Sequence, residues 1–274
     1  MSENISYVDL AAQWTSERDE LLPLIEKVLA SGQYIGSDEV SRFEKDAASY
    51  FGVTYACALN SGTDALVCGL AALGVKPGDE VITPPNSFIA STAAIVHLGA
   101  IPVFVDVQPD QNIDPSLIRQ AITQKTKAIM PVHLTGRVAN MREICEVANE
   151  YCLPIIEDAA QAAGSSLGNT KAGAWGSIGC FSAHPLKNLN AFGDAGFVLT
   201  KDKKIFDKII RMRNHGLTSR DTVEEFGYVS RLDSIQAAVL RNRLIRLDDI
   251  TFQRKENAKI YKNILNYVEK SQKN

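Results

Sequence analysis

Lys187 stands in the stretch FSAHPLKNLNAFGDAG, which runs from Phe181 to Gly196 and surrounds this lysine with small and apolar residues. Because desolvation disfavours the charged form of an amine, a lysine among apolar groups loses its proton more easily, and a neutral amine attacks carbonyl carbons. Lys187 is therefore a candidate nucleophile. Lysines beside loops are common in chains of this size, so this interpretation depends on partners elsewhere in the chain.

Ser61-Gly62-Thr63 is a candidate anion site. These residues follow a short apolar segment, Val53 to Leu59, and precede Ala65 to Leu73, which has helix-forming composition. A glycine permits close backbone approach, and the start of a helix offers free N–H groups and a positive dipole end to a phosphate. An ordinary helix cap by a serine or threonine is the alternative.

Asp158 follows the apolar run Leu153 to Ile156, at the expected end of a buried strand. A carboxylate is costly there unless a cation or hydrogen bonds stabilise it, so Asp158 predicts a positively charged ligand atom nearby. Capping of a following helix is the alternative. Gln161, three residues on, lies near Asp158 if a helical turn begins there, and it offers an amide to the same ligand.

Phe88 and Ser182 complete this set of candidates. Phe88 follows a strand expected to end near Thr83 and is placed to cover a flat ring, although a phenylalanine at a helix start often belongs to the core. Ser182, five positions before Lys187, offers a hydroxyl to a phosphate. An anion site, an acid for a cationic ring nitrogen, a flat cover and a carbonyl-binding lysine are together what pyridoxal 5′-phosphate (PLP) needs. The sequence therefore predicts PLP as the cofactor.

Short apolar runs alternate with longer helical patterns through the middle of the chain, which is typical of βαβ units and of a parallel sheet covered on both faces. We expect strands near residues 80–83, 102–106, 128–131, 154–157, 178–182 and 196–200, and helices near 87–98, 115–122, 140–151 and 204–214. Parallel sheets place ligands at the carboxyl ends of their strands, so this α/β fold brings the candidate residues together.

Helical patterns flank this region on both sides. Residues 15–31 and 37–51 are predicted to be helices, the second opening at Ser37 with Asp38 and Glu39 in its first turn. From Ser230 to about Tyr267 a long, mostly polar helical pattern follows, broken near residues 248–249, and we expect it to cover little core by itself.

Composition excludes several other classes of protein. Hydrophobic residues at 45%, charged residues at 22% and a net charge of −3 show no basic excess, so nucleic acid is not expected as a partner. No apolar run reaches the length of a membrane span and no signal peptide is recognised, which predicts a cytoplasmic protein without membrane contact. The five scattered cysteines and four separated histidines predict no metal site. No GxGxxG follows a strand and no GxxxxGK[ST] occurs, which argues against dinucleotide or nucleoside-triphosphate binding.

A series of longer motifs extends over almost the whole chain. They are NSGTDAL (60–66), GDEVITPPNSF (78–88), PVHLTG (131–136), IIEDAAQAAGS (155–165), CFSAHPLKNLNAFGDAGF (180–197), RNHG (213–216) and GYVSRLDSIQAA (227–238), and residues 34–53 match as well. In these motifs and their order the chain resembles the sugar aminotransferases of the DegT/DnrJ/EryC1/StrS type. Those are PLP enzymes of the aspartate-aminotransferase fold (fold type I), which has a mostly parallel central sheet with helices on both faces.

The resemblance implies a role for each candidate residue. Lys187 and Asp158 would be catalytic, Lys187 as the lysine that holds PLP and Asp158 as the partner of the pyridine nitrogen. The remaining cofactor-binding residues would contact the phenolic oxygen, hold the phosphate or stack on the ring: Gln161 for the first, Ser61, Gly62, Thr63 and Ser182 for the second, and Phe88 for the third. Because a second subunit usually completes each active site in this family, the resemblance also implies a homodimer.

Two features depart from the family pattern. Val229 stands where many relatives have the asparagine of GYNSR, which reaches the phosphate of the neighbouring subunit, so Ser230 or Arg231 is expected to substitute. The chain ends at Asn274, with almost none of the smaller C-terminal domain of the relatives. We expect an N-terminal helical segment (1–52), a large PLP-binding α/β domain (53–229), and a long helix with the start of a truncated small domain (230–274).

The resulting hypothesis is a PLP-dependent aminotransferase that transfers an amino group from glutamate to a keto group of a nucleotide-linked sugar, in surface polysaccharide, lipopolysaccharide or related sugar biosynthesis. The short C-terminal region leaves open a catalytically impaired or regulatory PLP-binding protein. A PLP-dependent sugar dehydratase is a further alternative, but the known relatives of that type have histidine in place of the lysine that this chain retains as Lys187.

Overall fold

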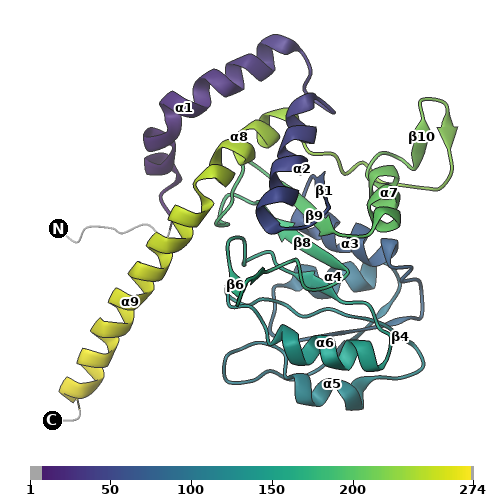
Figure 1. Ribbon diagram of the computed structural model, residues 1–274, viewed down its shortest axis with the longest axis vertical. Helices are drawn as coiled ribbons and strands as arrows, with labels where there is room; N and C mark the ends of the chain where they lie inside the picture. The colour runs from purple at the N-terminus through teal and green to yellow at the C-terminus, as the bar shows by residue number, and fades with distance from the viewer. Residues whose placement is uncertain (1–7, 273–274) are drawn as a thin grey trace.

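The computed structural model describes residues 8–272 (Figure 1). Residues 1–7 and 273–274, at the ends of the expected N-terminal and C-terminal segments, lie outside the described residues. Within the described part, the element order alternates strands and helices through the middle of the chain, as the sequence predicts.

Strands of two sheet segments continue into one another through isolated bridges. Among the described residues, β3 (Ile101–Phe104), β2 (Glu80–Thr83) and β4 (Thr126–Ile129) form a parallel three-stranded segment, and β5 (Ile156–Asp158), β8 (Ile178–Ser182), β9 (Gly196–Thr200) and β1 (Tyr55–Leu59) form a four-stranded one. Parallel bridges join Ile129 to Ile155 and Val132 to Asp158, so the order is β3-β2-β4-β5-β8-β9-β1. The sheet is mostly parallel, as expected, but β9 runs antiparallel to both of its neighbours.

Helices cover both faces of this sheet (Figure 1). The helices of the described residues are α1 (Leu10–Ser31), α2 (Asp38–Phe51), α3 (Gly62–Ala72), α4 (Ile89–His97), α5 (Pro115–Ala121), α6 (Met141–Glu150), α7 (Lys203–Met212), α8 (Ser234–Ile245) and α9 (Leu247–Gln272). Of these, α1 packs on α8 and α9 lies away from the sheet. Successive strand residues point to opposite faces. Accordingly Phe181 and Phe197 pack in a core with α2 and α8, whereas Cys180 and Val198 pack in a second core with α3 and α7. Two small hairpins were not predicted: β6 (Ser166–Leu167) with β7 (Thr170–Lys171), and β10 (Leu217–Ser219) with β11 (Thr222–Val223).

The C-terminal helical pattern behaves differently from the expectation in two respects. The break lies at Arg246, between α8 and α9, and not near residues 248–249. The expectation that this region covers little core is wrong for α8, since Ala237, Leu240 and Leu244 are buried against α2. The sequence of α8 looks polar because it contains arginines, but one of them, Arg243, is buried. Helix α9 then extends away from the rest of the chain, with Phe252, at 63% exposure, among its exposed apolar side chains (Figure 1).

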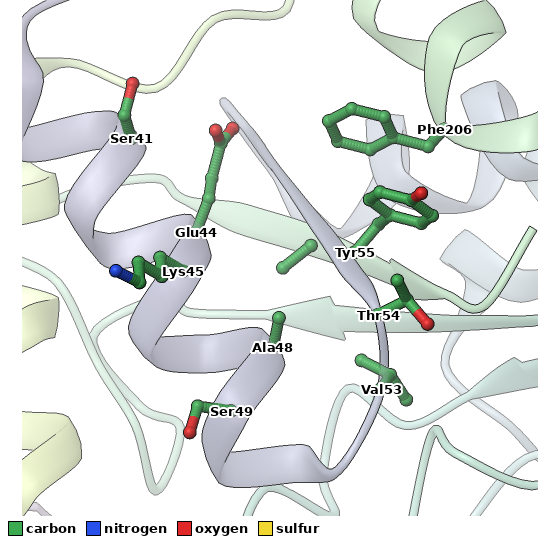
Figure 2. Close-up of a pocket in the computed structure, with 10 residues that line it drawn as sticks. Ser41, Glu44, Lys45, Ala48, Ser49, Val53, Thr54, Tyr55 and Phe206 are labelled. Atoms are coloured by element: carbon green, nitrogen blue, oxygen red, sulfur yellow. The ribbon is translucent and has the colours of Figure 1, made fainter. Parts of the chain in front are cut away.

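The edge strand β1 is protected by a pair of charged residues. Glu44 of α2 accepts a hydrogen bond from the backbone N–H of Ala58 at 2.9 Å, and Arg213 donates to the Ala58 carbonyl at 2.7 Å while also pairing with Glu44. Unpaired edge groups are a template for unwanted strand pairing, so this pair closes part of the edge. A cavity of about 440 Å³ remains beside it, with Glu44 on one wall and the stacked rings of Tyr55 and Phe206 on the other (Figure 2).

Phe197 lies at the centre of the core between the sheet and α2. Its ring stacks on Phe181 with centroids 4.6 Å apart, and Phe43 meets it edge-on at 5.6 Å. Only 1% of its surface is exposed. This aromatic cluster anchors β8 and β9, the two strands that flank the lysine-bearing loop.

We expect Phe197→Ala to lower the free energy of unfolding by about 3–5 kcal/mol, because it removes a buried ring and leaves a cavity. Phe252→Ala, on the exposed part of α9, is the matched control and should change stability by no more than about 0.5 kcal/mol. Urea denaturation followed by circular dichroism measures both. Equal losses for the two variants would contradict the assignment of the core.

Candidate functional site

All eight candidate residues line one cavity of about 340 Å³ at the carboxyl ends of β5 and β8: Ser61, Gly62, Thr63, Phe88, Asp158, Gln161, Ser182 and Lys187. They come from the start of α3, the start of α4, the end of β5 and the turn after it, and the end of β8 and the segment after it. The rule that ligands of parallel sheets bind at the strand ends therefore located the cavity from the sequence.

Lys187 is held in the segment 183–195 between β8 and β9, which we call the lysine loop. Its backbone N–H donates to the His184 carbonyl at 2.8 Å in a tight turn. Burial lowers the pKa of the Lys187 amine, and the negative charge of Asp158 acts in the opposite direction. Because the lowering prevails, the amine gives up its proton more readily than an exposed lysine does.

Asp158 is the last residue of β5 and has only 5% of its surface exposed. Its Oδ2 accepts a hydrogen bond of 2.6 Å from the hydroxyl of Ser91, and its Oδ1 accepts one of 3.1 Å from the backbone N–H of Ala160. In the described chain β5 is followed by the strand β6 and not by a helix, so the alternative that Asp158 caps a following helix is wrong, and its bond to Ala160 belongs to a turn. Asp158 lines the cavity, where a carboxylate favours a cationic ligand atom.

Ser91 is a site residue that the sequence reasoning missed. It lies on α4, is 1% exposed, and also lines the cavity. A serine in the otherwise apolar run IASTAAIV is a weak signal, because a hydroxyl on a buried helix face requires a partner. Its bond to Asp158 orients the carboxylate.

The anion site depends on close contact between Gly62 and Ser182. The Ser61 hydroxyl accepts from the backbone N–H of Asp64 at 3.1 Å, so the capping alternative is correct for this side chain. A Cβ atom on Gly62 would lie 2.5 Å from the Cβ of Ser182. The N–H groups of Gly62 and Thr63, in the first turn of α3, have no acceptor within the helix and together with the Ser182 hydroxyl suit a phosphate.

Phe88 and Gln161 also line the cavity; Phe88 comes just before α4, and Gln161 lies in the turn after β5. Phe88 precedes Ile89, the first residue of α4, and 70% of its surface is exposed, so the alternative of a core residue is wrong. A large aromatic ring exposed at a cavity favours a flat ligand against its face. Gln161 lines the same cavity, as expected for a turn that begins after Asp158.

Glu157, next to Asp158 in β5, forms a buried network that sequence reasoning also missed. Its carboxylate accepts from the backbone N–H groups of Gly173, Trp175 and Gly176 at 2.7–2.8 Å and lies 2.9 Å from His133 Nε2. His133 Nδ1 accepts from the backbone N–H of Ala139, so the ring proton is on Nε2. The network holds the end of β5 in place directly behind Asp158.

Of the two residues expected to substitute for the asparagine that Val229 replaces, the structure argues against Ser230, and the expectation for Arg231 stays a prediction. Val229 is 55% exposed, but Ser230 is fully buried and its hydroxyl donates to Asn60 Oδ1 within the same chain at 3.1 Å. Ser230 is therefore unable to reach a neighbouring subunit. Arg231 donates to Asn214 Oδ1 at 3.1 Å and is partly exposed.

The residues present fit PLP. Gly62 lets Ser182 approach more closely than a Cβ at position 62 would allow, the Phe88 ring is exposed beside the cavity, and the buried Asp158 suits a protonated ring nitrogen. Within residues 8–272 no group of three or more His, Cys, Asp or Glu side chains is arranged to hold a metal ion. No helix in the same range is long and apolar enough to cross a membrane.

Comparison with known proteins identifies relatives whose names agree with a PLP site of this kind. The model of the DegT/DnrJ/EryC1/StrS aminotransferase family matches residues 15–273. A pleiotropic regulatory protein of Geobacillus stearothermophilus is 39% identical over 96% of this chain and 71% of its own length. A dTDP-3-amino-3,4,6-trideoxy-alpha-D-glucose transaminase of Streptomyces venezuelae is 42% identical over 89% of this chain and 65% of its own length.

A solved structure shares both the fold and a cofactor of the expected class. It is the crystal structure of ntda from Bacillus subtilis with bound cofactor PMP, which is 36% identical with a TM-score of 0.83 and covers 90% of this chain. This chain covers 58% of that protein and 65% of the Streptomyces venezuelae transaminase, less than two thirds of each. The TM-score of 0.83 over 90% of this chain confirms the predicted fold of PLP-dependent aminotransferases.

We expect Gly62→Ala to weaken PLP binding at least about tenfold, because the added methyl group displaces Ser182 from the anion site. Gly193→Ala is the matched control in the lysine loop, since its Cβ would meet the nearest atom, Gln236 Nε2, at an ordinary 3.6 Å. Titration with PLP followed by absorbance gives both affinities. Unchanged affinity in Gly62→Ala would argue against a phosphate at this position.

The lowered pKa of Lys187 makes stability depend on pH in a definite direction. Between that lowered value and the usual 10.5, the unfolded chain binds more protons at this residue than the folded chain, so the free energy of unfolding rises with pH. Wild type should therefore gain stability relative to Lys187→Met as pH rises through this window. Urea denaturation at several pH values tests this, with Lys262→Met on α9 as the control for losing a surface charge. A difference between wild type and Lys187→Met that does not vary with pH would contradict the burial of the amine.

Proposed function

We propose, from the premise that this chain belongs to the DegT/DnrJ/EryC1/StrS aminotransferase family, that it acts as a PLP-dependent aminotransferase. The observation that carries the proposal is that Lys187, whose pKa is lowered by burial, and the buried Asp158 line the same cavity. Under this proposal the eight candidate residues have the roles that the sequence analysis gives them.

The chemistry divides between the cofactor and the protein. When bound, PLP supplies an aldehyde that condenses with amines and a ring that withdraws electrons from the adjacent carbon. Lys187 Nζ, in its neutral form, takes the proton from the carbon that carries the amino group and later returns one. Asp158, oriented by Ser91, keeps the ring nitrogen protonated through its negative charge.

The remaining residues bind and orient. The N–H groups at the start of α3 and the Ser182 hydroxyl hold the phosphate, and the Phe88 ring excludes water from one face of the cofactor. Gln161 contacts the phenolic oxygen. Fixing the phosphate at one end and the ring nitrogen at the other sets the position of the reactive carbon relative to Lys187.

We propose glutamate as the amino donor and a keto group on a nucleotide-linked sugar as the acceptor. The name of the transaminase from Streptomyces venezuelae, whose sugar carries dTDP, supports this substrate class. We propose that the product serves surface polysaccharide, lipopolysaccharide or related sugar biosynthesis, and that the protein is cytoplasmic.

A homodimer is part of the proposal. Apolar side chains are exposed at and beside the cavity. Leu186, which lines it, is 52% exposed, and Val229, whose carbonyl accepts a hydrogen bond from Asn60 next to Ser61, is 55% exposed. Exposed apolar residues that gather near a site favour an interface. A second subunit placed there would cover the open side of the cavity.

A second candidate function is regulatory binding of PLP without turnover. It is favoured by the relative from Geobacillus stearothermophilus, which is named a pleiotropic regulatory protein and is similar over nearly the whole chain. A sugar dehydratase is disfavoured, because Lys187 occupies the position at which such relatives have histidine.

Lys187→Ala should lose the visible absorbance that PLP acquires when a lysine binds it, and should lose amino transfer at least about a thousandfold, because both cofactor attachment and proton transfer need the amine. Absorbance spectra with PLP and the release of 2-oxoglutarate from glutamate measure the two effects. An unchanged spectrum in the variant would refute the role of Lys187. Wild-type binding of PLP without 2-oxoglutarate release would favour the regulatory function.

A further inference from the structure

Arg243 is a buried arginine on α8 that connects α1 to the lysine loop. Only 2% of its surface is exposed. On one side its Nε and Nη2 donate to Glu17 Oε2 of α1 at 3.0 and 2.6 Å. On the other side its Nη1 donates to the backbone carbonyl and to Oδ1 of Asn190, at 2.7 and 3.0 Å. One guanidinium therefore links two segments that are distant in sequence.

Asn190 in turn closes the lysine loop around Lys187. Its Nδ2 donates to the Pro185 carbonyl at 2.9 Å, so one side chain joins positions on both sides of the lysine. Gln13 of α1 pairs with the same amide through two hydrogen bonds of 3.2 and 3.1 Å. Asn190 is 5% exposed, so these bonds are shielded from water.

This network lies directly behind the reactive lysine. A cavity of about 240 Å³ is lined by Gln13, Glu17, Asn190 and Lys187 together. Lys187 also lines the candidate active-site cavity, so it separates the two spaces. A change in the network therefore alters the backbone on which the amine is mounted.

Stability alone does not account for an arginine in this place. A buried ion pair offsets its desolvation only with good geometry and additional hydrogen bonds, and an apolar set of similar volume is often equally stable. The guanidinium fork, with donors aimed in several directions, is what permits simultaneous bonds to Glu17 and Asn190. The geometry thus suits the alignment of α1, α8 and the loop.

We propose that Arg243 is a positioning residue for Lys187: bound to Glu17 and Asn190, it fixes the path of the lysine loop and keeps the amine half-buried beside Asp158. The inference rests on the proposed function for the importance of Lys187. Its test measures the lysine itself in addition to cofactor binding.

Charged and titratable side chains from several elements lie around Lys187, and their charges also affect how readily its amine loses a proton. They line the two cavities that Lys187 separates and are Asp158 at the end of β5, His184 and Asp194 in the lysine loop, Glu17 on α1 and Arg254 on α9. Substitution of Arg243 leaves all of them in the chain, so a change at Lys187 reports the loop position.

Competitive acetylation of Lys187 across pH, read by mass spectrometry of the full chain without added PLP, is the first measurement, and PLP affinity is the second. In Arg243→Met the loosened loop admits water to the amine, so the pH of half-reaction rises and PLP binding weakens about tenfold. Arg241→Met is the matched control, since Arg241 lies on the same helix and pairs with Asp46 and Glu39 at the surface. It should leave both values unchanged.

Arg243→Lys separates positioning from charge balance. The ammonium keeps a charge opposite Glu17 but is a point donor that does not span Glu17 and Asn190 as the fork does. Recovered thermal stability with a still-raised pH of half-reaction supports the proposal. A wild-type acetylation profile in Arg243→Lys, or in a folded Arg243→Met, overturns it.

Asn190→Ala decides the matter if Arg243→Met does not fold by circular dichroism. This variant keeps the Glu17–Arg243 pair and the bond from Arg243 to the backbone carbonyl of residue 190. It loses the side-chain bonds of Asn190 to Arg243, Pro185 and Gln13. A raised pH of half-reaction supports the proposal, and an unchanged one overturns it. Failure of the proposed function would show separately, as wild-type protein that does not bind PLP.

Discussion

The burial of Asp158 at the end of β5 is the constraint on which the site depends. A carboxylate with 5% of its surface exposed is destabilising unless partners offset the lost water, and Ser91 and Ala160 supply two hydrogen bonds. Under the proposed function, a cationic ring nitrogen would complete the compensation. The negative charge of Asp158 also opposes the lowering of the Lys187 pKa. In that proposal one carboxylate would act on both the cofactor ring and the amine that exchanges protons beside it.

Glu157 shows why the two adjacent carboxylates of β5 have different roles. Neighbouring strand residues point to opposite faces, so Glu157 points into the protein while Asp158 points to the cavity. Glu157 is fully buried, and three backbone N–H groups and His133 satisfy its oxygens completely. Asp158 has fewer protein donors. The difference in partners makes Glu157 a structural anchor and leaves the charge of Asp158 available to a ligand.

The sequence predicted the parts of this arrangement that depend on local pattern. The strands at 80–83, 178–182 and 196–200 occur at the predicted residues, because short apolar runs bounded by other residue types mark buried strands. The eight candidate residues share one cavity because each lies at or after a strand end or opens a helix. Their individual roles remain predictions. The direction of β9 was missed, although the lysine loop contains no helix and parallel neighbours usually need one between them.

What the local pattern does not contain is the pairing of distant residues. Arg243 made α8 look polar, yet it is buried because Glu17, 226 positions away, compensates its charge. Ser91 likewise meets Asp158 over 67 positions. Residues that carry chemistry lie at strand ends, where short motifs reveal them, whereas residues that hold them in place come from remote helices. A single sequence therefore shows the reacting groups of such a site more readily than the contacts that align them, and those contacts require the folded structure.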